Sequence, residues 1–168
     1  MKILLILRHA KSSWENPLLE DIDRPLNPRG LKTAPLMGQW AVQKELIPQK
    51  ILTSPAKRAI QTAQLFSKAT KMNININSTE SFYPGETKDF LKALSLEPET
   101  VSTLMIVGHN PSLEIFLQYL TEKNESLSTC SLAVIHFFHK NWQEISSHPK
   151  GKLIQVYRPK ELFKEPTD

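Results

Sequence analysis

The chain has 168 residues, of which 40% are hydrophobic and 23% charged, and only 5 are glycine. This length suits one folded domain with its own core, and the composition excludes collagen-like, low-complexity and largely disordered chains. The 21 lysines and arginines against 17 acidic residues give a net charge of +4, which is compatible with an anionic substrate but does not identify one. We therefore expect a single domain over residues 1–168.

Membranes, nucleic acids and metals are not expected as partners. The longest apolar run, Ile3–Leu7, has five residues, far fewer than a bilayer span or a signal peptide requires. No basic run is interleaved with aromatic residues, as in many nucleic-acid-binding proteins. Cys130 is the only cysteine, so the chain has neither an internal disulfide nor a cysteine cluster for zinc. The sequence predicts a cytoplasmic protein without a cofactor.

Short apolar runs alternate with stretches of helical periodicity over the first two thirds of the chain. Runs rich in Ile, Leu and Val predict buried strands at Lys2–Leu7, Lys50–Thr53 and Thr103–Val107, with a weaker strand at Asn73–Asn77. Helical spacing predicts helices at Pro28–Leu46, Pro55–Ala69, Thr87–Ser95 and Pro111–Leu120. This alternation indicates an α/β fold.

Two regions depart from the simple alternation. Pro35 lies inside the first helical stretch, and because proline removes a backbone hydrogen bond we expect a kink or break there. From Leu132 onward the pattern predicts a β-meander of three strands, Leu132–Phe138, Trp142–Ser147 and Lys152–Tyr157. The remaining residues, 159–168, are predicted to form a docked or frayed tail.

Polar residues follow the three strongest strands where each one ends. The first ends in Arg8 and His9, the second leads into a helix that carries Arg58, and the third ends in Gly108 and His109. Ligands of open α/β sheets bind beyond the carboxyl ends of the strands. We therefore expect Arg8, His9, Arg58 and His109 to share one cleft.

Two arginines and two histidines in one cleft suit a phosphoryl group. Guanidinium groups bind phosphate oxygens bidentately, and helix N-termini add N–H donors. One histidine can act as the nucleophile while the other donates to the phosphoryl oxygens. The chain has no acidic cluster suited to magnesium, so no metal is expected. Ser54 and Asn110 each precede a proline and a helical stretch, and are predicted to be N-caps.

Three segments carry a resemblance to a known family. Leu7–Ala10, Ser54–Thr62 and Val107–Asn110 resemble, in order, the signature segments of the histidine phosphatase superfamily, also called phosphoglycerate mutase-like. The short chain, the segment Asp23–Gly30 and the closing strands Leu132–Tyr157 resemble its SixA group of phosphohistidine phosphatases. The resemblance implies a three-layer α/β/α sandwich with a mainly parallel sheet.

The resemblance also implies roles for individual residues. His9 would be the nucleophile that becomes phosphorylated, while Arg8, Arg58 and His109 would bind and stabilise the transferring phosphoryl group. Arg24 and Asn110 would be further anion contacts. Arg24 could equally pair with Asp21 or Asp23 and hold the loop in place.

The chain departs from the family pattern in two places, and the position of the general acid is matched only loosely. Ala10 stands where the commonest motif has glycine, and Glu15 stands where the mutase-type pattern has asparagine, which disfavours a sugar-phosphate mutase. Glu80 matches the position of the general acid only loosely. Phosphohistidine needs less help from an acid than a phosphate ester does, because its P–N bond is labile and imidazole is a good leaving group.

The sequence thus predicts a metal-independent phosphatase whose partner is a phosphorylated histidine-containing protein, such as a histidine phosphotransfer domain. One alternative is a small-molecule phosphomonoesterase or mutase on the same scaffold. Against it, only 50 residues separate Arg58 from His109, which leaves little room for a capping insertion. A second alternative is a non-catalytic module that binds a phosphorylated partner and does not need His9 as a nucleophile.

Overall fold

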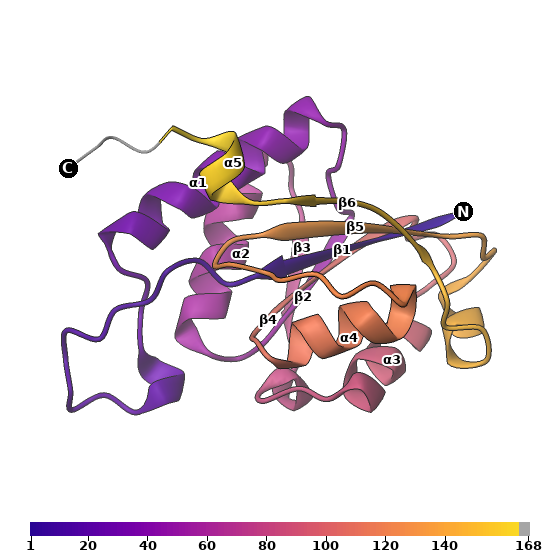
Figure 1. Cartoon of the computed structure of the whole chain (residues 1–168), viewed down its shortest axis with the longest axis horizontal. Helices are drawn as coiled ribbons and strands as arrows, with labels where there is room; N and C mark the ends of the chain where they lie inside the picture. Colours follow the sequence, from indigo (N-terminus) through magenta and orange to yellow (C-terminus); the bar gives the residue numbers. More distant parts are fainter. Residues whose placement is uncertain (165–168) are drawn as a thin grey trace.

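A six-stranded sheet forms the centre of the molecule, and the computed structural model describes residues 1–164 (Figure 1). Its strands, in chain order, are β1 (Lys2–Arg8), β2 (Lys50–Thr53), β3 (Asn75–Ser78), β4 (Thr103–Gly108), β5 (Leu132–Phe137) and β6 (Lys152–Tyr157). They lie side by side in the order β3-β2-β4-β1-β5-β6. The first four run parallel, whereas β5 pairs antiparallel with both β1 and β6. The predicted mainly parallel sheet is confirmed.

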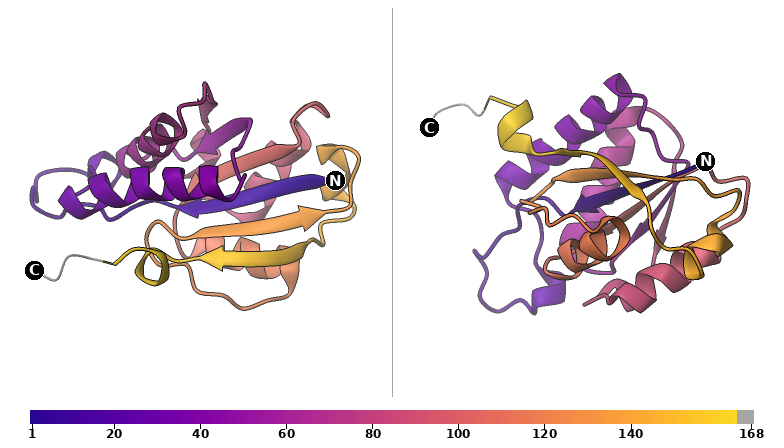
Figure 2. Two further views of the ribbon diagram at one scale, coloured as in Figure 1. Left: turned by 90° about the horizontal axis from the view of Figure 1, so that it is seen from above. Right: turned by 45° about the vertical axis from the view of Figure 1, so that its right-hand side comes forward.

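Helices cover both faces of this sheet (Figure 2). The helices α1 (Pro28–Gln43) and α2 (Lys57–Thr70) lie on one face, and α3 (Thr87–Ser95) and α4 (Ser112–Thr121) lie on the other. Short 3₁₀ helices, η1 (Asp21–Asp23), η2 (Glu80–Phe82) and η3 (Trp142–Ser146), and a last turn, α5 (Pro159–Leu162), complete the elements. The predicted three-layer α/β/α sandwich is confirmed.

The alternation of side chains along β1 builds two separate cores. Leu5 and Leu7 pack with Phe66 of α2 on one face. Leu4 and Ile6 pack with the aromatic residues of α3 and α4 on the other face. Because β1 is apolar on both faces, it reads as a continuous hydrophobic run in the sequence, which is typical of a central strand in a covered sheet.

Pro35 does not break α1, so the predicted break is wrong. The helix continues through it from Pro28 to Gln43. Ala34, Met37 and Ala41 are fully buried against α2 and the sheet, and this packing outweighs the cost of about 3 kcal/mol that proline adds inside a helix.

The predicted N-caps, Ser54 and Asn110, are also wrong. The N-cap of α2 is Ala56 and that of α4 is Pro111, so both helices begin later than predicted. Ser54 is still held by the sheet through its N–H bond to the Val107 carbonyl (2.9 Å). Asn110 instead donates its side-chain amide to the Leu127 carbonyl and to the carboxylate of Glu114 in the first turn of α4 (both 2.8 Å).

The middle strand of the predicted meander is instead the 3₁₀ helix η3. A capping box starts it, since the side chains of Asn141 and Glu144 each accept from the other residue's backbone N–H. Trp142 is fully buried and donates to the Val101 carbonyl (2.7 Å). The outer strands β5 and β6 are confirmed, and β3 lies slightly later than the predicted Asn73–Asn77.

The first part of the predicted tail is docked. Pro159 is buried, and the Phe163 ring lies edge-on to Trp40 of α1, with centroids 6.5 Å apart. Residues 165–168 lie outside the described part of the chain. Among residues 1–164, no helix is long and apolar enough to cross a membrane.

The close approach of α1 to α2 at Gly38 gives a stability prediction. A Cβ at this position would lie 2.5 Å from the Phe66 carbonyl oxygen and 2.9 Å from the Ala69 Cβ. Alanine normally stabilises a helix by about 1 kcal/mol relative to glycine, but here we expect Gly38→Ala to lower the free energy of unfolding because α2 must move. Urea unfolding measures the change.

The control is Lys32→Ala, an exposed position on the same helix, which should change stability by less than about 0.5 kcal/mol. A Gly38→Ala protein more stable than wild type would contradict the close packing of α1 on α2.

Candidate active site

The ends of three parallel strands bring the predicted site residues to one edge of the sheet. Arg8 at the end of β1 pairs in register with Gly108 at the end of β4, and Thr53 of β2 pairs with Val107. The residues that follow these strands therefore begin side by side. In Figure 1 the loop after β1 projects beyond this edge of the sheet.

His9 follows β1 directly and is 7% exposed. Its N–H bonds to the Gly108 carbonyl (3.1 Å), and its ring Nδ1 lies 2.7 Å from the carbonyl oxygen of Ala10. A carbonyl only accepts, so Nδ1 carries the proton and Nε2 keeps its lone pair. Ala10 is itself fixed to α2, because its N–H bonds to the Thr62 hydroxyl (2.9 Å).

His109 lies against His9, with ring centroids 5.1 Å apart. Its Nε2 is 2.7 Å from the hydroxyl oxygen of Ser54, and Tyr83 covers the ring from another side with centroids 5.6 Å apart. His109 is 8% exposed, and its Nδ1 is buried with no hydrogen-bond partner among residues 1–164.

Arg58 extends from the first turn of α2 and is bound by the loop after β1. Its two terminal nitrogens donate to the backbone carbonyl (2.7 Å) and the carboxylate (3.0 Å) of Asp21. The same carboxylate accepts from the Tyr83 hydroxyl (2.6 Å) and from Arg24 (2.9 Å). Asp21 thus joins the β1–α1 loop, α2 and the Tyr83 segment at the mouth of the site.

Arg8 is half-buried beside the histidines. One terminal nitrogen donates to the Leu127 carbonyl (2.9 Å), while its Nε is buried without a partner in the described chain. Asn110 bonds to the same carbonyl (2.8 Å), so Arg8 and Asn110 meet at Leu127. Glu114 completes this group by accepting from the Leu127 N–H (2.8 Å).

Arg24 pairs with Asp21, which was the alternative left open by the sequence. Its remaining nitrogens donate to the Ser12 hydroxyl (2.6 Å) and the Ser13 carbonyl (3.1 Å). All three of its nitrogens thus donate to protein groups, and Arg24 is connected to Arg58 through Asp21. Trp14 lies flat under this guanidinium, 3.2 Å from its central carbon to the ring centroid, and is itself 75% exposed.

Glu80 makes no hydrogen bond with either histidine. Its side chain is exposed at the start of η2, and it makes no hydrogen bond or ion pair within the described 164 residues. The backbone at Glu80 does contribute to the site, because its carbonyl accepts from the Tyr83 N–H (3.2 Å).

The surroundings keep both site histidines neutral. Burial, followed by the repulsion of His109, Arg58 and Arg8, lowers the pKa of His9 to about 3. Burial and the charge of Arg58 lower the pKa of His109 to about 4. Hydrogen bonds from Tyr83, Arg24 and Arg58 hold the pKa of Asp21 below its ordinary value. At neutral pH the site therefore combines two neutral imidazoles with two guanidinium groups.

This arrangement suits a small tetrahedral oxyanion. Four buried side-chain atoms lack a hydrogen-bond partner within residues 1–164, and three of them belong to Arg8, His109 and Asn110. Unpaired polar groups are costly inside a protein, and those at functional sites are the ones that a ligand satisfies. Among the described residues, no group of three or more His, Cys, Asp or Glu side chains could hold a metal ion.

Three participants were missed by sequence reasoning. Ser54 was interpreted only as a cap, Asp21 only as a partner of Arg24, and Tyr83 was not considered. Asp21 is 37 residues from Arg58 and 62 from Tyr83, and no local pattern signals contacts over such separations. The sequence did offer a local signal, because Asp21 lies three residues before Arg24 and so indicated an ion pair within the loop.

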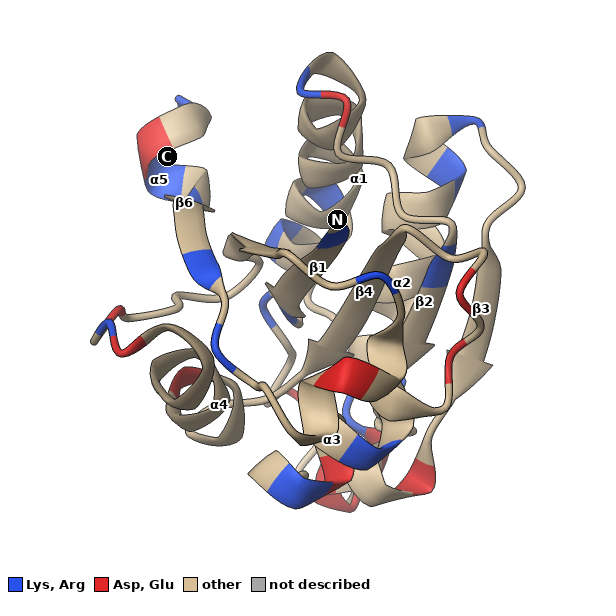
Figure 3. Cartoon of the chain, turned by 90° about the vertical axis from the view of Figure 1, so that its right-hand side faces the viewer, with Lys and Arg blue, Asp and Glu red and all other residues tan. Residues whose placement is uncertain are grey.

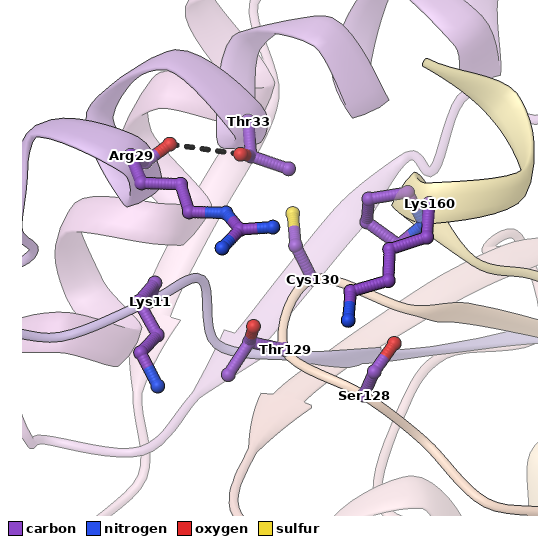
Figure 4. Close-up of a pocket in the computed structure, with 8 residues that line it drawn as sticks. Lys11, Arg29, Thr33, Ser128, Thr129, Cys130 and Lys160 are labelled. Atoms are coloured by element: carbon purple, nitrogen blue, oxygen red, sulfur yellow. Dashed lines mark hydrogen bonds between the residues drawn. The ribbon is translucent and has the colours of Figure 1, made fainter. Parts of the chain in front are cut away.

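A separate basic pocket lies beside the site, between α1, α5 and the loop before β5 (Figure 4). It is lined by Lys11, Arg29, Thr33, Ser128, Thr129, Cys130, Pro159 and Lys160. Its link to the site is the backbone, since the Cys130 N–H bonds to the carbonyls of Arg8 and His9 (both 3.1 Å). Basic and acidic residues are otherwise interspersed, as on α3 in Figure 3.

Comparison with known proteins agrees with this geometry. The model of the histidine phosphatase superfamily (branch 1) matches residues 4–81. An uncharacterized chloroplastic protein of Arabidopsis thaliana is 33% identical over 150 residues, which cover 84% of this chain and 69% of that protein. The chain spans 69% of the length of that protein and 64% of an uncharacterized Mycobacterium tuberculosis protein, which is 32% identical over 106 residues.

Solved structures with the same fold include proteins named SixA. The structure that carries the name phosphohistidine phosphatase SixA from Agrobacterium tumefaciens has a TM-score of 0.80 at 28% identity, covering 94% of this chain and 98% of that one. The protein histidine phosphatase SixA complexed with tungstate has a TM-score of 0.83 at 19% identity, covering 96% and 99%. The chain belongs to the histidine phosphatase superfamily, and these similarities support a phosphatase.

The two buried histidines predict how stability depends on pH. The unfolded chain takes up a proton on each imidazole near its ordinary pKa of 6.5, whereas the folded chain does so only near 3 for His9 and 4 for His109. The unfolded state thus binds more protons below pH 6.5, so stability falls as the pH drops. Each histidine adds a slope of up to about 1.4 kcal/mol per pH unit.

Urea unfolding between about pH 7.5 and pH 5 measures this slope. We expect a shallower slope in His9→Gln and in His109→Gln than in wild type, and an unchanged slope in the control His148→Gln, an exposed position. Equal slopes in all four proteins would contradict the neutral, buried state of the two rings.

Proposed function

We propose that the chain is a metal-independent phosphatase that hydrolyses phosphohistidine on a protein, through a phosphohistidine intermediate on His9. The observation that carries the proposal is the hydrogen bond from His9 Nδ1 to the Ala10 carbonyl (2.7 Å). It leaves Nε2 of a neutral imidazole unprotonated among Arg8, Arg58 and His109. An unprotonated nitrogen held among phosphate-binding cations is what nucleophilic phosphoryl transfer requires.

In the first step His9 Nε2 attacks phosphorus as the P–N bond of the substrate breaks. When the distal ring nitrogen of the substrate carries a proton, its imidazole departs neutral and takes the electron pair of that bond. The phosphorylated His9 ring then carries a positive charge, and the hydrogen bond from its Nδ1–H to the Ala10 carbonyl stabilises that charge. Arg8 and Arg58 supply the positive charge that stabilises the transferring phosphoryl oxygens, and His109 supplies a donor.

In the second step water attacks the phosphorus atom of the phosphorylated His9. The P–N bond breaks toward His9, which recovers its neutral form with the proton still on Nδ1, and dihydrogen phosphate leaves with both protons of the water. This step requires no metal ion and no second acid, because the water supplies both protons of the product. The proposed ligands of the site are thus the phosphoryl group and the phosphate product.

The exposed position of Glu80 favours phosphohistidine over phosphate esters. An alkoxide leaving group needs a proton donor in the transition state, and Glu80 makes no hydrogen bond with His9 or His109 in the described chain. A protonated phosphohistidine ring already carries the proton that its departure requires. The chemistry of the leaving group therefore matches a site that lacks an evident acid.

The segment between Arg58 and His109 supports a protein-borne substrate. It is occupied by α2, β3, η2, α3 and β4, all of which form the sandwich, so this segment contributes no capping domain over the site. A small-molecule phosphomonoesterase or mutase remains the alternative on the same scaffold. A third candidate, a binding module, would use Arg58 and dispense with the reactivity of His9.

The test is phosphate release from a phosphorylated histidine phosphotransfer domain and from p-nitrophenyl phosphate, without added metal. We expect wild type to release phosphate from the protein faster than from the ester, and His9→Ala to release it from neither. Arg58→Ala should lower kcat/KM by about 10²–10³-fold, as does loss of other donors to transition-state charge. Glu80→Gln should leave turnover of the phosphoprotein unchanged.

His136→Ala is the matched control, since His136 pairs with Ile3 at the opposite end of the sheet. Cleavage of the ester alone would replace the proposal with a small-molecule phosphatase. If neither substrate were cleaved, while the phosphoprotein bound in an Arg58-dependent way, the binding module would be correct. Loss of activity in Glu80→Gln would assign Glu80 as the general acid.

A further inference from the structure

Ser54 is a buried hydroxyl in contact with His109, and its hydrogen bonds can be assigned from the number of available protons. The residue is fully buried. Its Oγ accepts the N–H of Ala56 (3.1 Å) and lies 2.7 Å from His109 Nε2. The Ala56 N–H can only donate, so among the described residues His109 Nε2 is the acceptor left for the hydroxyl proton.

The opposite assignment leaves one more polar group unsatisfied. If Nε2–H donated to Ser54, the serine proton would be buried without an acceptor, and His109 Nδ1 would still have no partner in the described chain. A buried polar group without a partner destabilises the folded state. The hydrogen-bond pattern therefore favours donation from Ser54 to Nε2.

We infer that Ser54 is a positioning residue that fixes the tautomer of His109, so that Nδ1–H is presented as a neutral donor to the phosphoryl oxygens. The inference rests on the proposed function of the site. The partner of one ring nitrogen determines which nitrogen carries the proton. With Nε2 occupied by the Ser54 hydroxyl, the single proton of the neutral ring lies on Nδ1, and His109 meets an anion with a donor instead of a lone pair.

Both histidines then carry their proton on Nδ1, but different groups hold it there and different nitrogens are left free. In His9 the Ala10 carbonyl holds the proton on Nδ1 and leaves Nε2 free to attack. In His109 the Ser54 hydroxyl covers Nε2 and leaves the Nδ1 proton free to donate. One ring is prepared as a nucleophile and the other as a hydrogen-bond donor, although both are neutral.

The direct test is ¹⁵N NMR of the histidine side chains, with the His109 signals identified by their loss in His109→Gln. Wild type should show a protonated Nδ1 and an unprotonated Nε2. Ser54→Ala should move the proton toward Nε2, and kcat/KM should fall about 10–100-fold, as when a partner that orients another functional histidine is removed. In the His109→Gln background, Ser54→Ala should cause no further loss, because both changes remove the same donor.

Thr53→Val is the control. Its hydroxyl is buried next to Ser54 and donates only to the Ser54 carbonyl (3.1 Å), so both the tautomer and the activity should be retained. A protonated Nε2 in wild type, or an unchanged tautomer in Ser54→Ala, would overturn the inference. If wild type had no His9-dependent phosphatase activity, the proposed function would fail, while the NMR spectrum would still decide the role of Ser54.

Discussion

The in-register parallel pairing of β1 with β4 is the constraint on which the site depends. It sets Arg8 opposite Gly108, so that His9 and His109 leave the sheet as neighbours, with ring centroids 5.1 Å apart. A shift by one residue would turn Leu4 and Ile6 toward α1 and α2 and would separate the histidines. The two cores that cover β1 therefore fix the geometry of the histidines as well as the stability of the sheet.

Asp21 provides a second level of organisation around this pair. Its backbone and carboxylate together bind Arg58, Arg24 and Tyr83, which belong to three separate segments of the chain. Although half of its side chain is exposed, these donors stabilise the carboxylate in its ionised form. Asp21 thereby orients the Arg58 guanidinium from the loop. The Arg58 backbone carbonyl accepts from the Thr62 hydroxyl (2.7 Å), and the same hydroxyl oxygen accepts from the Ala10 N–H. Arg58 and the segment that carries His9 are thus positioned by connected hydrogen bonds.

Sequence reasoning predicted the features that local patterns encode. Apolar runs that end in Arg8–His9 and Gly108–His109 define both the buried strands and the edge of the sheet at which the two histidines meet. It failed where tertiary contacts outweigh local preference. Packing keeps Pro35 inside α1, and Ser54 lies two residues before the N-cap Ala56, with its hydroxyl in contact with His109. The capping box of Asn141 and Glu144 was readable in the sequence and would have corrected the predicted strand at Trp142. The contacts of Asp21 were beyond reach, because they join segments that are distant in the chain.

The central claim is that His9 carries the phosphoryl group during turnover. The most direct measurement mixes the protein with a phosphorylated histidine phosphotransfer domain, stops the reaction in alkali, in which phosphohistidine survives, and locates the phosphoryl group by peptide mass spectrometry. The account predicts phosphorylation at His9 that forms and decays at rates compatible with turnover, and none in His9→Ala. Turnover without a phosphorylated His9, or with the phosphoryl group on another residue, would contradict it.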